Sequence, residues 1–134
     1  MKNLAKISML CLLGMLFTFS STYATSGDKT TEKARAAVKD AAPDDWETLA
    51  RAANMCIKKK VNLSEAKEWL DTSLGIKESA MANEVAGDYY MLNKLYDKAI
   101  NHYVKSMMMA KESDFYADTA ELQAKIEKAK ALNS

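Results

Sequence analysis

Apolar residues recur every three or four positions along most of residues 44–134. This spacing places apolar side chains on one face of a helix, where neighbouring helices can bury them. No segment alternates apolar and polar residues over the length of a strand, and no Asn-Gly or Asp-Gly hairpin turn occurs. The sequence therefore predicts an all-α domain of about five helices.

Polar residues mark the expected helix ends. Asp44 and Asn62 each precede a glutamate by three residues, as in a capping box at the start of a helix. Lys58-Lys59-Lys60 suits the negative end of a helix dipole, and Gly75 suits a left-handed helix stop. These signals bound the first two helices. The later helices are expected over about 78–92, over about 96–110 and from 113 or 114 onward.

Residues 25–43 are polar and rich in alanine, and Pro43, the only proline, separates them from the helical region. Their apolar stripe is thin and consists of Ala34, Ala37 and Val38. Such a stripe buries too little surface to hold a helix in place. We therefore predict a flexible lead-in over 25–43, with a loosely docked helix as the alternative, and a folded domain over 44–134.

Residues 1–24 have the pattern of an export signal. Lys2 and Lys6 precede an uncharged apolar run over 7–19, and Ala24 is a small residue at a plausible cleavage point. A helix over this run is about 20 Å long, shorter than a hydrocarbon core of ~30 Å. We therefore expect cleavage, no stable membrane span afterwards, and a periplasmic or secreted protein. An uncleaved anchor is the alternative.

Removal of residues 1–24 also changes the charge. The whole chain carries a formal net charge of +1, and the signal segment contributes two lysines and no acid, so the remainder carries −1. A nucleic-acid binder needs a basic face that displaces counterions from phosphates. The near-neutral balance therefore argues against nucleic acid as a partner.

Few residues in the expected mature chain offer catalytic or metal-binding chemistry. Cys56 is its one cysteine and His102 its one histidine, too few for a zinc site of usual composition. The acidic residues lack the spacing of a calcium loop, and no phosphate-binding loop or nucleophile elbow occurs. We predict no metal, no cofactor and no enzymatic activity. Cys56 is expected to be buried, with an intermolecular disulfide as the alternative, and His102 to be solvated.

Two clusters offer chemistry for a partner. The Lys58-Lys59-Lys60 run can attract an acidic partner or an anionic membrane surface, or it can be a solvated helix end. The Met107-Met108-Met109 run can form an adaptable binding surface, or its members can fill the core. Three consecutive residues cannot all face one side of a helix, and we expect Met109 to be the exposed one.

The stretch from Gly87 to Tyr103 resembles a tetratricopeptide repeat (TPR). That family pairs a glycine and a tyrosine on its first helix, and places an aromatic residue before the turn. An alanine lies where the two helices cross, and a further aromatic residue follows one turn later. The matching residues in this chain are Gly87, Tyr90, Tyr96, Ala99 and Tyr103, with Ser106 as a later small residue.

A weaker copy of the pattern lies 33 residues earlier, with Ala66 in the place of Ala99. Its other matching residues are Ala53, Ile57, Leu70 and Ser73. Asn54 replaces the glycine. The resemblance implies a short solenoid of stacked helical hairpins over about 45–111, in which the last helix acts as a solvating cap.

The expected capping helix has one apolar and one charged face. The apolar face comprises Phe115, Thr119, Leu122, Ile126 and Ala129. The charged face comprises Glu121, Lys125, Glu127, Lys128 and Lys130. A cap of this kind turns its charged face to solvent.

The first helices of successive TPR repeats line a concave groove that binds a peptide. Carried over by position, the first copy contributes Thr48, Arg51, Met55, Lys58 and Lys59. The second copy contributes Met81, Glu84, Asp88, Met91 and Leu92. The groove is then basic on one side and acidic on the other. Family members that hold a peptide carboxylate use lysines and asparagines, whereas Met55 and Glu84 occupy those places here.

These observations favour an exported, non-enzymatic adaptor that binds a peptide or helix of another protein in the concave groove. The alternative is a structural or self-associating module of an envelope assembly. Two copies are fewer than the roughly three repeats that a self-sufficient stack needs. The last helix can then pair with a second copy and form a homo-oligomer.

Overall fold

The computed structural model describes residues 26–134, so the predicted signal over 1–24 lies outside the described residues. Within residues 26–134 there are six helices and no strand, which confirms the predicted all-α fold. The helices are α1 (Ser26–Asp40), α2 (Trp46–Lys59), α3 (Leu63–Ile76), α4 (Ala80–Leu92), α5 (Tyr96–Ser113) and α6 (Ala120–Leu132).

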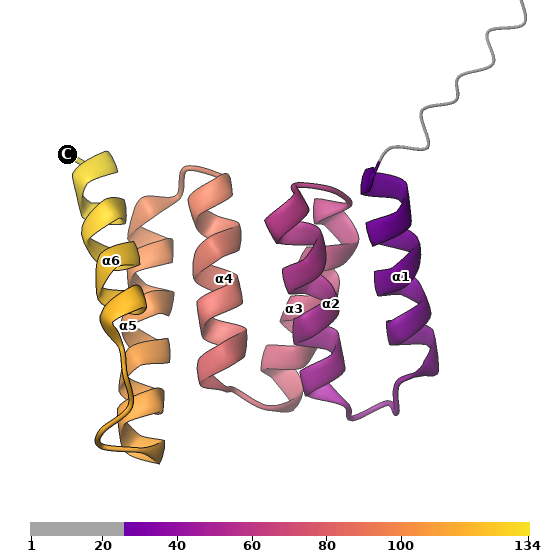
Figure 1. Cartoon of the computed structure of the whole chain (residues 1–134), viewed down its shortest axis with the longest axis horizontal. Helices are drawn as coiled ribbons and strands as arrows, with labels where there is room; N and C mark the ends of the chain where they lie inside the picture. Colours follow the sequence, from indigo (N-terminus) through magenta and orange to yellow (C-terminus); the bar gives the residue numbers. More distant parts are fainter. Residues whose placement is uncertain (1–25) are drawn as a thin grey trace, which may run out of the picture.

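The helices follow one another across the molecule in chain order, from α1 at one side to α6 at the other (Figure 1). Consecutive helices pack together as α1 with α2, α2 with α3, α4 with α5, and α5 with α6. Helix α4 also contacts α2 and α3, which joins the two halves. In Figure 1, α3 and α5 lie behind α2 and α4, so the described residues form two layers.

The predicted flexible lead-in over 25–43 is wrong, because α1 is a helix that packs against α2. Ala34 has no exposed surface and joins the core beside Ala50 and Ala53 of α2. Arg35 donates from Nε and Nη2 to both carboxylate oxygens of Glu65 on α3, at 2.8 and 2.6 Å. Each alanine buries little apolar area, but its small side chain allows two helices to approach closely. A prediction based on the number of large apolar residues overlooks this contribution.

Two helix boundaries differ from the prediction, and one agrees with it. Asp45, rather than Asp44, caps α2, since its Oδ1 accepts from the Thr48 backbone N–H at 2.9 Å. Helix α2 ends at the lysine run, as predicted, and Lys60 adopts a left-handed conformation there. Gly75 lies inside α3, and no glycine in the described part has a positive φ. The prediction relied on residue preference, whereas the caps depend on which backbone groups lack partners.

The region after α5 also differs. Helix α5 continues to Ser113, and α6 begins only at Ala120. Phe115 was expected to be buried, but it lies in the intervening loop and is 78% exposed. Met109 was expected to be exposed, yet Met108 is the exposed member of the methionine run.

Tyr103 of α5 packs directly on the backbone of α4. A Cβ atom at Gly87 would lie 2.3 Å from the Tyr103 ring, so only glycine fits without a shift. This confirms the prediction that a close helix contact explains the glycine inside α4. Cys56 is fully buried, as predicted, among the alanines of the larger core cluster.

In the part of the chain that the structure describes, no helix is both long and apolar enough to cross a membrane.

Candidate functional site

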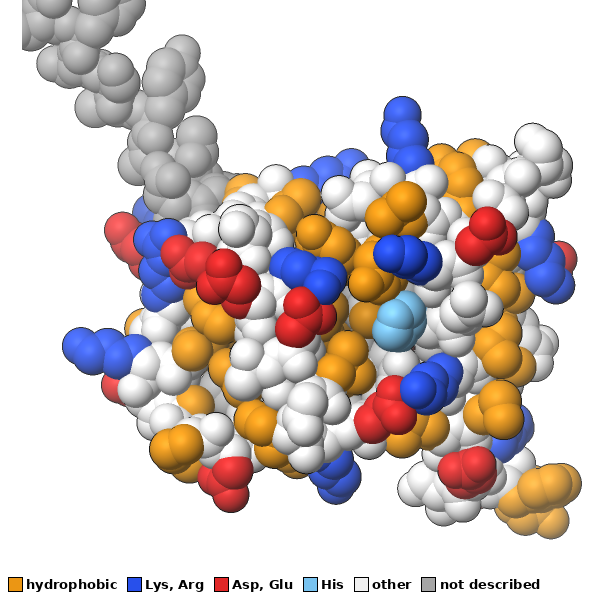
Figure 2. Space-filling view, turned by 180° about the vertical axis from the view of Figure 1, so that it is seen from behind, with side chains coloured by type: hydrophobic (Ala, Val, Ile, Leu, Met, Phe, Trp, Pro, Cys, Tyr) orange, Lys and Arg blue, Asp and Glu red, His pale blue; other side chains and the backbone are white. Residues whose placement is uncertain are grey.

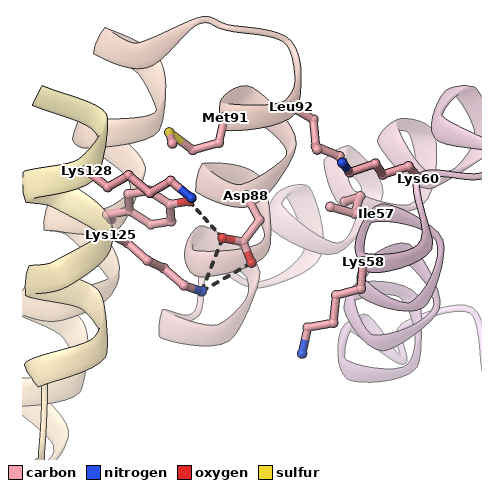
Figure 3. A pocket seen from close by; sticks show the side chains of 9 residues that line it. Ile57, Lys58, Lys60, Asp88, Met91, Leu92, Lys125 and Lys128 are labelled. Carbon is pink, nitrogen blue, oxygen red and sulfur yellow. Dashed lines mark hydrogen bonds and ion pairs between the residues drawn. The ribbon is translucent and has the colours of Figure 1, made fainter. Parts of the chain in front are cut away.

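The candidate site is a groove between α2, α4 and α6 (Figure 3). Its main cavity has a volume of about 260 Å³ and is lined by Ile57, Lys58, Lys60, Asp88, Met91, Leu92, Tyr103, Lys125 and Lys128. A second cavity of about 160 Å³ shares Lys58, Asp88 and Lys125 with the first. We refer to the two adjoining cavities as the central groove.

The apolar part of the central groove comes from two helices. Ile57 projects from the last turn of α2 and is 2% exposed, so it forms a fixed part of the wall. Met91 and Leu92 lie in the last turn of α4 and are half-buried. Both side chains are apolar, and methionine is also flexible. This wall can therefore contact apolar side chains of different shapes.

Lys125 of α6 holds the two carboxylates of α4. Its Nζ lies 2.6 Å from Glu84 Oε1 and 3.1 Å from Asp88 Oδ1 (the latter drawn in Figure 3). Asp88 also accepts a hydrogen bond from the Tyr103 hydroxyl at 2.7 Å. Burial lowers the pKa of Lys125, but Glu84 and Asp88 outweigh it and the net direction is upward. Lys125 therefore stays charged and offsets one of the two carboxylate charges of α4.

The Tyr103 hydroxyl is a fixed donor in this cluster. Burial, followed by the hydrogen bond to Asp88, raises the pKa of the phenol. Its ring is packed on Gly87, so the hydroxyl has one position. The cluster therefore joins α4, α5 and α6 through polar contacts along one side of the central groove.

The predicted acidic side of the groove is partly offset within the protein. The acidic side chains Glu84 and Asp88 are present, but Lys125 pairs with both. Lys125 was assigned to the solvent face of the last helix, whereas its side chain is only 23% exposed. One lysine offsets only one of the two carboxylate charges, and Glu121 of α6 adds a third carboxylate 3.6 Å from Lys125 Nζ, so this side keeps a net negative charge.

Three other lysines around the central groove are exposed. Lys58 and Lys60 approach from the α2 side and Lys128 from α6 (Figure 3). Their side chains make no hydrogen bond or ion pair with any part of residues 26–134 that the structure places. The two cavities together are lined by four lysines and three carboxylates, so the central groove has a formal net charge of +1, and its charged side chains without a partner are these three lysines.

Six of the ten predicted groove residues line the central groove, namely Lys58, Met81, Glu84, Asp88, Met91 and Leu92. Met55 and Lys59, together with Lys58, line a separate cavity of about 390 Å³ against α1. Thr48 contacts its cap residue, with Oγ1 donating to Asp45 at 2.6 Å. Arg51 pairs with Glu47 one turn earlier.

Sequence reasoning missed the contributions of α1 and α6. Lys29 and Lys33 of α1 line the cavity beside α2. Lys125 and Lys128 of α6 are three residues apart, which places them on one face of a helix. The three-residue spacing could have indicated that both lysines face the groove. It was not used, because the charged face of a capping helix was assumed to face solvent.

His102 was expected to be solvated, and this is wrong. It is half-buried between α4 and α5, with Nδ1 2.9 Å from Asn83 Oδ1 and its ring stacked on Tyr90. The contact to a carbonyl oxygen requires a proton on Nδ1. Burial, and then Lys105, lowers the pKa of His102. Figure 2 shows the single histidine on the opposite side of the molecule from the view of Figure 1.

Cys56 is not positioned for chemistry with His102. The thiol is fully buried among alanines, and burial raises its pKa. A thiol that is buried and protonated is a poor nucleophile. Among the described residues, no group of three or more histidines, cysteines, aspartates or glutamates is arranged to hold a metal ion.

Comparisons with known proteins supply no functional assignment. No protein-family model, no curated protein and no solved structure matches this chain.

Proposed function

We propose that this protein is an exported, non-enzymatic adaptor with a TPR-like helical stack, and that the central groove binds an acidic segment of another protein. The segment supplies at least one apolar side chain to the wall formed by Ile57, Met91 and Leu92. Its carboxylates pair with Lys58, Lys60 and Lys128. It binds as an extended peptide or as one face of a helix.

One observation carries this proposal, namely three unpaired lysines around an apolar cavity. Isolated surface lysines are common and mean little. Here Lys125 contacts all three carboxylates of the groove, on Glu84, Asp88 and Glu121, so the charged side chains without a partner are all lysines. Charge of one sign beside an apolar wall favours partners of the opposite sign and raises their association rate.

The TPR-like part of the proposal has its own support. Ala66 and Ala99 are fully buried, which allows α3 and α5 to approach their partner helices closely. Gly87 and Tyr103, two residues that carry the resemblance, are in direct contact. The proposal of export rests on the signal-like pattern of residues 1–24.

The test compares two charge reversals of equal size. The groove variant is Lys58→Glu with Lys60→Glu. The control variant is Lys39→Glu with Lys94→Glu. Lys39 lies in the last turn of α1, as Lys58 does in α2, and Lys94 is left-handed, as Lys60 is. Both variants have the same net charge, so any difference between them reports position.

Binding is measured by fluorescence anisotropy with two labelled peptide pools. In one pool a central leucine is flanked by aspartates and glutamates, and in the other the acids are replaced by lysines. We expect the wild type and the control to prefer the acidic pool, and the groove variant to bind it at least tenfold more weakly, about 1.4 kcal/mol. Equal affinity of the groove and control variants for the acidic pool would place the interface elsewhere.

A further inference from the structure

A second apolar groove lies on the other side of α6. It has a volume of about 420 Å³ and is lined by Ile100, Val104, Met107, Gln123, Ile126, Glu127 and Lys130. None of these residues lines the central groove. Ile100, Val104 and Met107 form a stripe along α5 and are all half-buried. We call this second groove the α5–α6 seam.

The loop that joins α5 to α6 presents two large apolar side chains. Phe115 is 78% exposed and Tyr116 is 88% exposed, and their rings meet edge to face with centroids 5.3 Å apart. The loop is held in place, because Lys111 Nζ donates to the Ala117 carbonyl at 2.5 Å and Asp114 Oδ1 accepts from the Tyr116 N–H at 2.9 Å. An ordered, exposed aromatic pair of this kind is a marker of an interaction site.

Charge is distributed unevenly along the α5–α6 pair. Glu112, Asp114 and Asp118 flank the aromatic pair in the sequence and, with Lys111, give that end a net charge of −2. Lys128 and Lys130 lie toward the other end and, with Glu127, which pairs with Lys130, give it a net charge of +1. Figure 1 shows the loop at one end of α6 and the C-terminus at the opposite end. Leu132, half exposed, adds an apolar side chain at the lysine end.

We propose that the α5–α6 seam is the interface of a two-fold symmetric homodimer. The two copies pair antiparallel along α6, so that the aromatic loop of each copy enters the lysine end of the other seam. An antiparallel arrangement brings the acidic end of one copy beside the basic end of the other, and does so twice. Phe115 and Tyr116 of each copy then cover Ile100, Leu132 and the neighbouring apolar stripe of its partner.

We infer that a second copy of the chain fills the α5–α6 seam, because the seam and the aromatic loop that would fill it both belong to the α5–α6 pair. The thirteen residues of α6 rise about 20 Å, which is the separation that the antiparallel pairing must bridge. A two-fold contact uses the same patch on both copies and closes on itself, so it gives a dimer and not a filament. The dimer leaves Lys58 and Lys60 free for the proposed peptide, and Lys128 is the one lysine that lies near both contacts.

The first test measures mass against concentration by sedimentation velocity, from the low micromolar to the millimolar range. We expect a monomer that converts to a species of twice the mass. The variant Phe115→Ser with Tyr116→Ser should weaken the dimer at least 30-fold, as expected for removal of aromatic anchors worth about 2 kcal/mol. Both residues are exposed, so the fold is retained. The control is Ile76→Ser, an exposed apolar residue at the end of α3.

The second test exchanges charge between the two ends. One variant is Glu112→Lys with Asp114→Asn, in which the asparagine oxygen still accepts from the Tyr116 N–H. The other variant is Lys130→Glu. Each variant alone should fail to dimerise, because both of its contacts now join like charges. An equimolar mixture should form a heterodimer, since both contacts join opposite charges again.

Several outcomes would overturn the proposed dimer. The protein could stay a monomer at every concentration, it could dimerise equally well without Phe115 and Tyr116, or its mass could grow without limit. The last result would indicate a head-to-tail contact. Peptide binding by the central groove is measured separately on the Phe115→Ser, Tyr116→Ser variant. Retained peptide binding with lost dimerisation distinguishes failure of one proposal from failure of the other.

Discussion

Helix pairs α2/α3 and α4/α5 have the same layout 33 residues apart, but they solve the same packing problem differently. In the second pair, Tyr103 packs on Gly87, where a Cβ atom would lie 2.3 Å from the ring. At the corresponding places of the first pair stand Leu70 and Asn54. Relative to the first pair, the second pair thus has a smaller residue on its first helix and a larger residue on its second, which is the size match expected at a closely packed crossing.

Some contacts are shared by both pairs. Ser73 Oγ donates to the carbonyl of Trp46, the first residue of α2, at 2.7 Å. Ser106 Oγ donates to the carbonyl of Ala80, the first residue of α4, also at 2.7 Å. In both pairs a buried hydroxyl on the second helix thus fixes the start of the first. The two pairs therefore share the hydroxyl contact, but they differ in the sizes of the two residues at the helix crossing.

The largest effect is expected when the asparagine of the first pair replaces the glycine of the second pair. Gly87→Asn should destabilise the protein by about 3 kcal/mol, because its Cβ overlaps the Tyr103 ring. Adding Tyr103→Leu should recover part of the loss, since leucine is smaller than tyrosine and stands at the corresponding place of the first pair. Chemical denaturation of both single variants and the double variant gives the coupling. Additive losses would contradict the size match.

A matched control for that experiment is Asn54→Gly in the first pair. Leu70 does not require glycine opposite, so the only expected cost is the helix propensity of glycine. That cost is below about 1 kcal/mol, because asparagine is itself a poor helix former. A loss as large as that of Gly87→Asn would show that α2 is sensitive to any change at this place.

The next largest effect is expected at the two buried alanines. Ala66→Leu and Ala99→Leu should each overpack a helix crossing and cost about 1–3 kcal/mol. We expect the larger loss at Ala99, because Tyr103 and Gly87 already fill the space beside it. Thermal melts of the two variants measure the difference. An unchanged melting temperature for either would mean that its helix pair is not closely packed there.

A smaller effect tests the shared contact. Ser73→Ala and Ser106→Ala should each cost about 1 kcal/mol, because each leaves a buried helix-end carbonyl without its side-chain donor. The two losses should agree within about 0.5 kcal/mol if the hydroxyls do the same thing in both pairs. Urea denaturation has the resolution needed. A loss confined to one serine would show that the equivalence is only geometric.

These pairs also show how far the sequence leads. The echo at Ala66 and Ala99 was enough to predict the helices and their buried faces, because periodicity reports burial directly. Ala34 was undervalued, since alanine contributes little to an apolar stripe, yet Ala34 is fully buried in the same core cluster as Ala50 and Ala53. Lys125 was misplaced because its burial depends on Glu84 and Asp88, which lie far away in the sequence. Six of the ten predicted residues therefore line the central groove, whereas the ion pairs of Lys125 were not predicted.

The loop before α6 illustrates a second limit. Phe115 was expected to be buried because its spacing from Thr119 and Leu122 fits a helix. Lys111 instead binds the carbonyls of Phe115 and Ala117, which stabilises a turn where the helix was expected. A lysine that contacts backbone carbonyls has no sequence signature, because any exposed lysine near a helix end can do so.

The subtlest difference between the two pairs is polar. The contact between His102 and Asn83 in the second pair is replaced by Trp69 and Ala50 in the first. Since His102 is the only histidine, the second pair alone should respond to mildly acidic pH. Burial, then Lys105, lowers the pKa of His102, with Lys67 acting in the same direction and Glu78 and Asp71 opposing it.

The direction of the pH effect on stability depends on whether the folded or the unfolded chain binds the proton at higher pH. Because the folded-state pKa lies below the unfolded value of about 6.5, the unfolded chain takes up the proton at the higher pH. Stability should be fully present above that value and should fall as the pH drops through the folded-state pKa. His102→Phe, which keeps a ring against Tyr90, should remove this component of the pH dependence. Denaturation curves at neutral and mildly acidic pH for both proteins provide the measurement, and an identical slope would assign the pH response to the carboxylates.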